Sequence, residues 1–204
     1  MTADTVDVKT LQQLPQIGGL DDSPRGRVLR AAAYLFHKQG YDKTTVRELA
    51  QLVGIQSGSL FHHFKTKDDI LLAVMEEAIR YNTARLEQAV QQNDDILKQI
   101  LALIRAELES INGDTGTAMA VLVFEWEALS ADRQDYLLNM REYYESIWLR
   151  ILQQAHAENM IQHPPFIWRR LIGGAISWTV TWYKPEGKLS LDELADIVMQ
   201  MGQA

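Results

Sequence analysis

Residues 44–67 read TTVRELAQLVGIQSGSLFHHFKTK, and this stretch decides the fold. Thr45 and Glu48 have the spacing of a capping box, in which a hydroxyl and a carboxylate three residues later satisfy free amides at a helix start. Apolar residues then recur at helical spacing, and Gly54 suits the left-handed backbone that ends a helix. A second helix begins two or three residues later. The stretch therefore predicts a helix-turn-helix, whose second helix enters the major groove of DNA.

The outer face of this second helix and the residues after it carry side chains that suit DNA. Their amide, hydroxyl and imidazole groups can reach base edges and phosphates. Lys67 falls in the first turn of the next helix, where a positive charge opposes the helix dipole, so a phosphate partner would explain it. Taken alone, Lys65 and Lys67 fit ordinary solvated charges as well. The predicted DNA-binding residues are Thr44, Thr45, Arg47, Gln56, Ser57, Gly58, Ser59, Phe61, His62, His63, Lys65 and Lys67.

Composition bounds the class of protein. The chain has 204 residues and no cysteine, which excludes disulfide bonds and thiolate metal sites and fits a reducing compartment. It has no apolar run long enough for a transmembrane helix, and its first residues lack the basic and apolar parts of a signal peptide. We therefore expect a cytoplasmic protein with no membrane partner.

Charge is distributed unevenly along the chain. The net charge is −7, which by itself argues against DNA binding. Residues 25–67, however, carry eight Lys and Arg against two acidic residues, a net charge of +6, whereas residues 68–204 carry −10. A basic module on an acidic body is the asymmetry expected of a protein that docks one end on phosphate.

Apolar periodicity predicts helices throughout and gives no sign of a strand. Besides the helix-turn-helix pair, we expect helices over residues 25–40, 67–92, 95–112, 117–129, 131–159, 166–183 and from 191 onward. The segment 117–129 is apolar nearly all round and should be central. The pair Gly173 and Gly174 predicts close approach by another backbone. The fold class is thus all-α with about nine helices, in a polar arm (1–24), a three-helix helix-turn-helix domain (25–66) and a larger helical domain (67–204).

On these residues the chain resembles the TetR family of one-component transcriptional regulators. The resemblance runs from Arg27 to Val74 and is dense over this range. The matching positions are Thr44, Thr45, Glu48, Leu49, Ala50, Gly54, Gly58, Leu60, Phe64, Lys67 and Leu71. The chain departs from the family at Phe61, where a tyrosine is more usual, so the hydroxyl that commonly touches a phosphate is missing there.

The resemblance implies a homodimer that binds double-stranded operator DNA. The last two helices of each subunit would form a four-helix bundle, and the helices over residues 67–159 would enclose an inducer pocket. Binding of the inducer would shift the helix over residues 67–92 and so re-space the two recognition helices. The predicted dimer interface is Leu171, Gly174, Trp182, Leu194, Ile197, Val198 and Met201.

The effector is predicted to be small and apolar. The tail, residues 178–198, resembles that of family members governing fatty-acid, acyl-CoA or sterol-ring catabolism and is expected to belong to the dimer interface. The effector that we expect is an acyl-CoA. A drug-responsive repressor of an efflux pump, and a helix-turn-helix adaptor without an inducer, remain alternatives. The predicted ligand-binding residues are Met119, Phe124, Met140, Arg141, Tyr144, Trp148 and Trp178, although each type also serves in an ordinary core.

Nothing in the sequence predicts an enzyme, a catalytic residue, a cofactor or a metal. It has no G-x-S-x-G motif and no Gly-rich phosphate loop. His62 and His63 are adjacent, and adjacent helical side chains diverge by about 100°, so they cannot readily share one ion.

Overall fold

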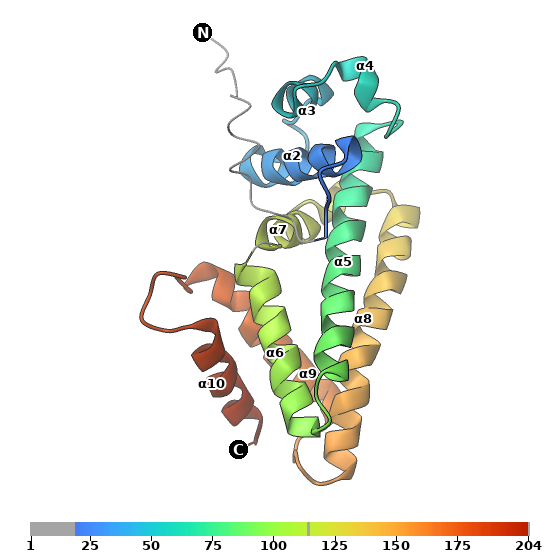
Figure 1. Ribbon diagram of the computed structural model, residues 1–204. Helices are drawn as coiled ribbons and strands as arrows, with labels where there is room; N and C mark the ends of the chain where they lie inside the picture. Colours follow the sequence, from blue (N-terminus) through green and yellow to red (C-terminus); the bar gives the residue numbers. More distant parts are fainter. Residues whose placement is uncertain (1–18, 114, 204) are drawn as a thin grey trace. The chain divides into compact units, whose positions relative to one another are not determined.

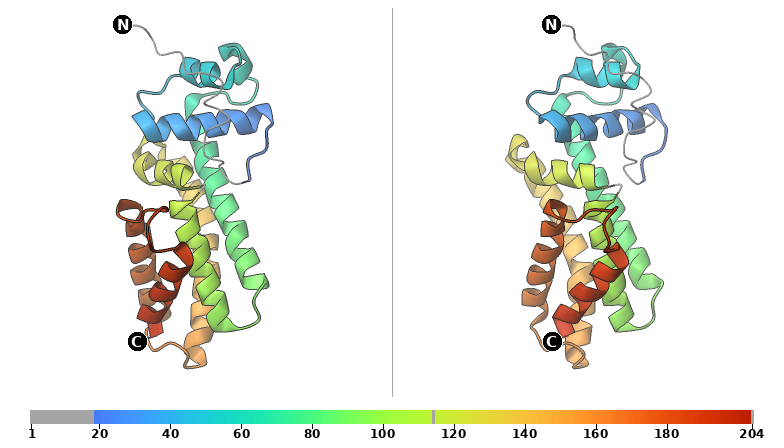
Figure 2. Two further views of the ribbon diagram at one scale, coloured as in Figure 1. Left: turned by 60° about the vertical axis from the view of Figure 1, so that its left-hand side comes forward. Right: turned by 90° about the vertical axis from the view of Figure 1, so that its left-hand side faces the viewer.

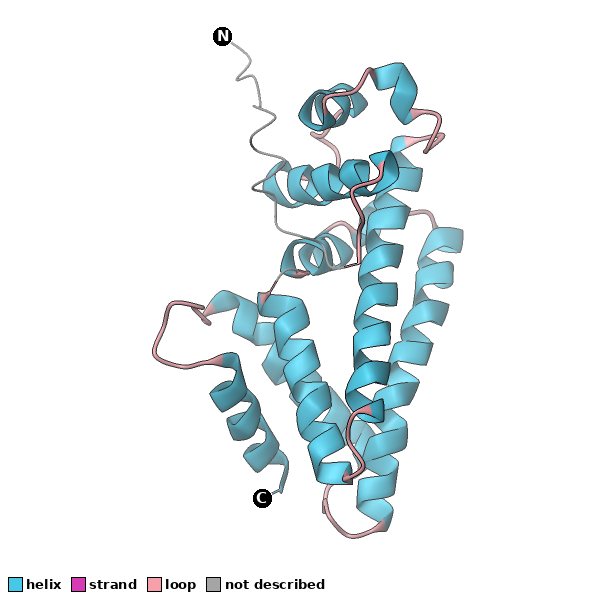
Figure 3. Cartoon of the chain, in the orientation of Figure 1, coloured by secondary structure: helices cyan, strands magenta, loops and turns pink. Residues whose placement is uncertain are grey.

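The computed structural model describes residues 19–113 and 115–203, and all regular structure in this part of the chain is helical (Figure 3). The predicted all-α class is confirmed. Nine α-helices and two short 3-10 helices lie in the described ranges (Figure 1). They are α2 (Pro24–Gln39), α3 (Val46–Val53), α4 (Ser57–Leu60), α5 (Lys67–Gln91), α6 (Ile96–Asn112), α7 (Gly116–Phe124), η1 (Trp126–Ala128), α8 (Ala131–Ala157), α9 (Pro165–Trp178), η2 (Thr179–Thr181) and α10 (Leu191–Gln203). Most of the predicted arm, residues 1–18, lies outside the described residues.

Side-chain caps explain where these helices begin. The amide of Thr45 donates to Glu48 at 2.8 Å and the amide of Glu48 donates to the Thr45 hydroxyl at 3.2 Å, so the predicted capping box is present. Ser190 and Glu193 form the same reciprocal pair at α10. Asp95 accepts a hydrogen bond from the Lys98 amide at 2.9 Å at the start of α6. These contacts satisfy amides that a helix start otherwise leaves unpaired.

The chain divides into two compact units. The first, here called the helix-turn-helix unit, comprises residues 19–78 and 117–137. In it α2 packs against α3, and α3 against α4. Phe36 is fully buried and meets the Tyr41 ring edge-on at 5.3 Å. Arg30, also buried, donates to the Leu20 carbonyl at 3.0 Å and thereby ties the end of the predicted arm to α2.

The second unit, here called the C-terminal unit, comprises residues 79–116 without 114 and residues 138–203. Its core is built on α6, which contacts α9, η2 and α10. Both views of Figure 2 show α10, in dark red, beside α6, in green. Trp148, Ile100, Leu103 and Ile176 are fully buried there. Helices α5 and α8 begin in the helix-turn-helix unit and continue into the C-terminal unit.

Two predicted helices differ from expectation. The segment 166–183 forms α9 followed by the 3-10 helix η2, and the segment 117–129 differs more. The segment 117–129 forms α7 and the 3-10 helix η1 rather than one helix. It is not central, because Val123 is 65% exposed and Phe124 is 73% exposed. Only Ala118, Val121 and Leu122 on α7 are buried. Apolar residues around the whole circumference do not by themselves ensure burial, since much of a folded protein's surface is apolar.

None of the helices in the described residues combines the length and the apolar character that crossing a bilayer requires.

Candidate functional site

The turn between α3 and α4 has the backbone geometry that the sequence predicts. Gly54 is left-handed, with φ 76° and ψ 30°. Its amide donates to the Gln51 carbonyl at 3.2 Å, and the Ile55 amide donates to the Ala50 carbonyl at 2.9 Å. These bonds satisfy the last carbonyls of α3 and set the direction in which the chain enters α4.

Helix α4 is a single turn whose position is fixed by two apolar anchors. It spans Ser57–Leu60 and continues into a turn over residues 61–63. Leu60 is fully buried and Phe64 is 5% exposed. The Phe64 amide donates to the Leu60 carbonyl at 3.1 Å. Burial of these two side chains directs the intervening residues outward.

Most of the predicted DNA-binding residues lie on the surface together. Gln56, Gly58, Ser59, Phe61, His62 and His63 are exposed, and Ser57 is half-buried. Thr45, Arg47 and Lys65 are exposed as well. The exposed row therefore presents an amide, hydroxyls, imidazoles and two cations, which are the groups that read base edges and bind phosphates. Phe61, with half of its surface exposed, adds an apolar face without a donor.

Thr44 and Lys67 have a different setting from the other predicted DNA-binding residues. Thr44 is 1% exposed, and its hydroxyl donates to the Gly40 carbonyl at 2.9 Å. The Lys67 ammonium group donates to the carbonyls of Tyr41 and Thr44 at 2.9 and 3.0 Å. It also lies 4.0 Å from the centre of the Tyr41 ring. Lys67 therefore has partners inside the protein, and these explain a positive charge in the first turn of α5 without a phosphate.

The two aspartates that follow Lys67 extend this network. The Tyr41 hydroxyl donates to Asp68, and the Arg133 guanidinium on α8 donates to Asp69. Burial and the hydrogen bond to Asp68 raise the pKa of Tyr41 above its usual value. Partial burial would raise the pKa of Asp69, but hydrogen bonds from Arg133 and Thr66 outweigh it and lower that pKa. Asp69 is therefore held in its charged form.

The seven predicted ligand-binding residues are divided between the two units. Met119 and Phe124 belong to the helix-turn-helix unit, and the other five belong to the C-terminal unit. Phe124 and Trp178 are 73% and 67% exposed, whereas Trp148 is fully buried. Arg141 is exposed, and Met119, Met140 and Tyr144 are half-buried. Of these residues, Tyr144 and Trp148 lie around one buried polar centre.

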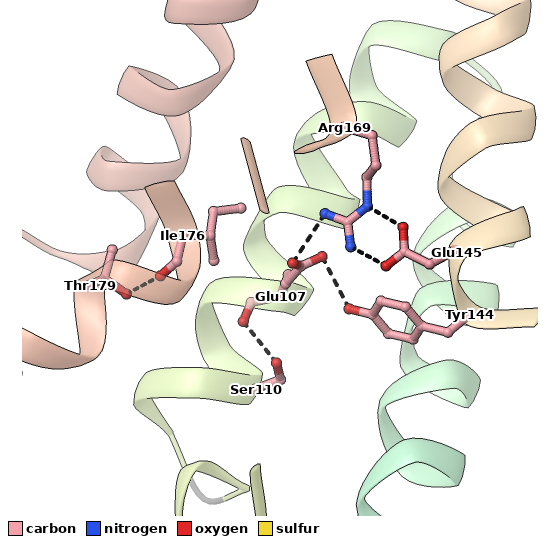
Figure 4. Close-up of polar contacts among 7 residues, drawn as sticks. All are labelled: Glu107, Ser110, Tyr144, Glu145, Arg169, Ile176 and Thr179. Atoms are coloured by element: carbon pink, nitrogen blue, oxygen red, sulfur yellow. Dashed lines mark hydrogen bonds and ion pairs between the residues drawn. The ribbon is translucent and has the colours of Figure 1, made fainter. Parts of the chain in front are cut away.

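Arg169 on α9 forms that centre (Figure 4). Its Nε and Nη2 donate to the two carboxylate oxygens of Glu145 at 2.9 and 2.7 Å. Its Nη1 donates to Glu107 at 3.2 Å, and Glu107 also accepts from the Tyr144 hydroxyl at 3.1 Å. The guanidinium lies 4.6 Å from the Trp148 ring centre. The cluster thus joins α9 to α6 and α8.

Burial and the neighbouring carboxylates together set the protonation of this cluster. Burial and the negative charge of Glu107 raise the pKa of Tyr144 well above its usual value. Burial alone would lower the pKa of Arg169, but Glu107 and Glu145 outweigh it and raise that pKa further. Sequence reasoning did not identify Arg169, Glu107 or Glu145. The available signal was one charged residue on the apolar face of each of α6 and α9.

Each unit also contains an open cavity. In the C-terminal unit, a cavity of about 320 Å³ is lined by Tyr81, Arg85, Glu109, Gly113 and Thr115. In the helix-turn-helix unit, a cavity of about 200 Å³ is lined by Phe36, His37, Ala120, Val121, Phe124 and Glu125. Phe124 is the one predicted ligand residue among these linings. No group of three or more His, Cys, Asp or Glu side chains that could hold a metal occurs in residues 19–113 and 115–203.

The predicted dimer residues separate into an exposed set and a buried set. Leu171 and Met201 are each 67% exposed, and Trp182 and Ile197 are 49% and 45% exposed. Gly174 is exposed as well. Leu194 and Val198, each 5% exposed, belong to the core of the C-terminal unit instead. Phe166, Ile167, Trp178 and Val180 of the same unit also leave much of their apolar surface exposed.

These features define an all-helical protein with an N-terminal helix-turn-helix and a second helical unit. Comparison with known proteins identifies the same two parts of the chain. The family model described as bacterial regulatory proteins, tetR family, matches residues 28–74, and the one described as tetracyclin repressor-like, C-terminal domain, matches residues 93–203. The chain belongs to the TetR family of transcriptional regulators.

Three relatives illustrate the range of the similarity. The HTH-type transcriptional repressor KstR2 of Mycolicibacterium smegmatis is 30% identical over 84% of this chain and 85% of its own. A crystal structure described as superantigen PfiT is 51% identical, covers 89% of this chain and 96% of its own, and has a TM-score of 0.80. AibR, described in complex with isovaleryl coenzyme A and operator DNA, is 20% identical, covers 89% of this chain and 98% of its own, and has a TM-score of 0.79.

Proposed function

We propose that this TetR-family transcriptional repressor binds operator DNA as a homodimer and is released by an apolar effector, an acyl-CoA. The observation that carries the proposal is the exposed row from Gln56 to His63, held outward by the buried Leu60 and Phe64. Its side chains have the chemistry of base and phosphate contacts. The row belongs to the segment of residues 25–67, which carries a net charge of +6.

Within this row the side chains have separable roles. Gln56, Ser57 and Ser59 are suited to hydrogen bonds with base edges, and His62 and His63 to bases or phosphates. Outside this row, the exposed Arg47 and Lys65 are suited to phosphates, and such contacts raise affinity without reading sequence. Gly58 lets the backbone approach the DNA. Phe61 packs on a sugar or a thymine methyl group because it has no hydroxyl to donate.

The homodimer is supported by the apolar surface of the C-terminal unit. Leu171, Trp178, Trp182 and Met201 each expose much of their surface, and exposed apolar surface is typical of protein interfaces where such side chains lie together. A twofold dimer would place two recognition segments on half-sites about 34 Å apart or a multiple of it. Effector binding that alters this spacing weakens DNA binding, and DNA must weaken effector binding by the same factor.

The effector class rests on fewer observations. AibR has the same fold and is described with isovaleryl coenzyme A and operator DNA together, so this fold accommodates both kinds of ligand. In this chain the exposed Arg141 is suited to a coenzyme A phosphate, and Met140 and Tyr144 to the acyl part. Met119, Phe124, Trp148 and Trp178 complete the proposed ligand residues. A cationic drug remains the competing effector.

The test has two stages. The full-length chain is first used to select duplexes from a random library, and the bound sequences identify the operator. Binding to that operator is then measured at two salt concentrations, with and without isovaleryl-CoA, a longer acyl-CoA and a cationic dye. Release by a thioester and not by the dye supports the proposal. Specific binding that only the dye reverses would show that the effector is a cationic drug and not an acyl-CoA. Failure to select any duplex would contradict the proposed function as a DNA-binding regulator.

The similarity to PfiT favours a second candidate function. At 51% identity the chain shares half of its aligned residues with a structure described as a superantigen. We infer T-cell stimulation as the second candidate function of this chain. A T-cell proliferation assay with the purified protein tests it. A purified chain that causes no stimulation would contradict this second function, and the double variant Arg47→Ala, Lys65→Ala would show whether stimulation depends on the proposed DNA-binding surface.

A further inference from the structure

The carboxylate of Asp69 is shared between two helices of the helix-turn-helix unit. One oxygen accepts the Thr66 amide at 3.0 Å, which caps the start of α5, and the Asp69 amide donates to the Thr66 hydroxyl at 3.1 Å. The other oxygen accepts from the Arg133 guanidinium on α8. The cap of α5 is therefore held from outside by a residue of α8.

The same turn of α5 also holds the segment before α3. Lys67 donates to the carbonyls of Tyr41 and Thr44, and Asp68 accepts from the Tyr41 hydroxyl. Three consecutive side chains, at positions 67, 68 and 69, thus join α5 to the turn after α2 and to α8. The chain passes from the end of α4 through residues 61–66 into this first turn of α5. The geometry of the turn therefore influences where residues 61–66 lie.

A second contact joins the same two helices. The Tyr136 hydroxyl on α8 donates to Glu76 on α5 at 3.2 Å. Arg133 and Tyr136 are three residues apart and therefore lie on one face of α8. Helix α8 then continues without a break to Ala157 and carries Tyr144 and Glu145 of the buried cluster. One continuous helix therefore bears both the contacts to the α5 cap and part of the core of the C-terminal unit.

We propose that Arg133 is a positioning residue for DNA binding, which acts through Asp69 on the exit from α4 without touching DNA. This inference rests on the proposed function and adds a second route for the effector, through α8 as well as α5. A shift of α8 would withdraw the guanidinium from Asp69. The cap of α5 would then lose a partner at the point where the recognition segment ends.

The test uses Arg133→Gln, which removes the charge, and Arg133→Lys, which keeps it. We expect Arg133→Gln to weaken binding to the selected operator about tenfold, which is the size of effect that one interaction between contacting residues commonly has. The dependence of log affinity on log salt should stay as in the wild type, because no phosphate contact is lost. Arg133→Lys should recover most of the affinity. Lys98→Gln, an equal loss of charge at an exposed position of α6, should bind like the wild type.

A double variant checks the route. Asp69→Asn with Arg133→Gln should bind no more weakly than Asp69→Asn alone if both act through one pair. If Arg133→Gln fails to fold, Tyr136→Phe replaces it, because it keeps the ring, removes the hydroxyl that donates to Glu76 and should weaken binding in the same way. Wild-type affinity in Arg133→Gln, or a shallower salt dependence, would overturn the inference. A wild-type chain that selects no duplex would instead overturn the proposed function.

Discussion

Gly173 lies one helical turn after Arg169 on α9, and a Cβ atom added to it would lie 2.8 Å from Arg169 Nη1. The guanidinium cannot move aside readily, because Glu145 and Glu107 hold it on both sides. Within this chain, the neighbour that requires a glycine at position 173 is therefore the Arg169 side chain and not another backbone segment. Gly174 differs, since no atom lies within 4 Å of its added Cβ.

Replacing Gly173 by alanine should therefore destabilise the protein. The new methyl group displaces a buried ion pair, and overpacking of this kind costs about 1–3 kcal/mol, more than the ~1 kcal/mol that alanine adds to helix stability. Urea unfolding at matched concentrations measures the difference. Gly174→Ala is the control and should lose no stability. Equal losses in both variants would contradict the role assigned to the space beside Gly173.

Stability should fall at alkaline pH partly because of Tyr144. Its pKa is raised in the folded state, whereas a tyrosine in the unfolded chain ionises at about pH 10. Above that pH the unfolded state has lost a proton that the folded state retains, so stability decreases as pH rises, by at most about 1.4 kcal/mol per pH unit for one group. Tyr144→Phe should flatten this decrease from about pH 10 upward, where the unfolded state is ionised and the folded state is not. An unchanged slope would show that Tyr144 ionises normally.

Lys65 and Lys67 should differ in their effect on DNA binding. Lys65 is exposed, so Lys65→Ala should weaken binding to every sequence and reduce the salt slope by about one. Lys67→Ala should also weaken binding, but with the slope preserved, because its ammonium group binds the carbonyls of Tyr41 and Thr44. Titrations at several salt concentrations separate the two effects. A slope reduced by Lys67→Ala would show that this side chain leaves its internal partners for a phosphate.

Self-association should depend on the exposed apolar face of the C-terminal unit. Leu171→Glu places a charge at a residue 67% exposed, so it should shift the protein toward monomer without unfolding it. Loss of the second half-site contact should then weaken operator binding by at least about a hundredfold. Sedimentation velocity measures the first effect. Val123→Glu, at an apolar residue 65% exposed in the other unit, is the matched control and should remain dimeric.

The sequence contains enough local information to predict the helices and the recognition segment. Capping residues such as Thr45 and Ser190, and the left-handed Gly54, act within a few positions of each other, so their structural effect can be read from the chain. The apolar anchors Leu60 and Phe64 likewise predict which residues face outward.

Contacts between distant segments could not be predicted in this way. The partners of Lys67 come from the turn after α2, more than 20 residues earlier, and nothing in the pattern around Lys67 identifies them. Arg169 and Glu107 are 62 residues apart and meet only after α6 and α9 have packed. Leu194 and Ile197 occupy one apolar stripe, and only the packed structure shows that the first is buried and the second is 45% exposed.

The brevity of α4 has a consequence for how this protein selects its sites. A helix of four residues has no stability of its own, since nucleation costs more conformational entropy than one turn of hydrogen bonds offsets. The recognition segment therefore keeps its form through the buried anchors Leu60 and Phe64 rather than through its own hydrogen bonds alone. A segment held in this way can follow grooves of different width, so we expect a graded set of related operators that the chain occupies in order of affinity as its concentration rises.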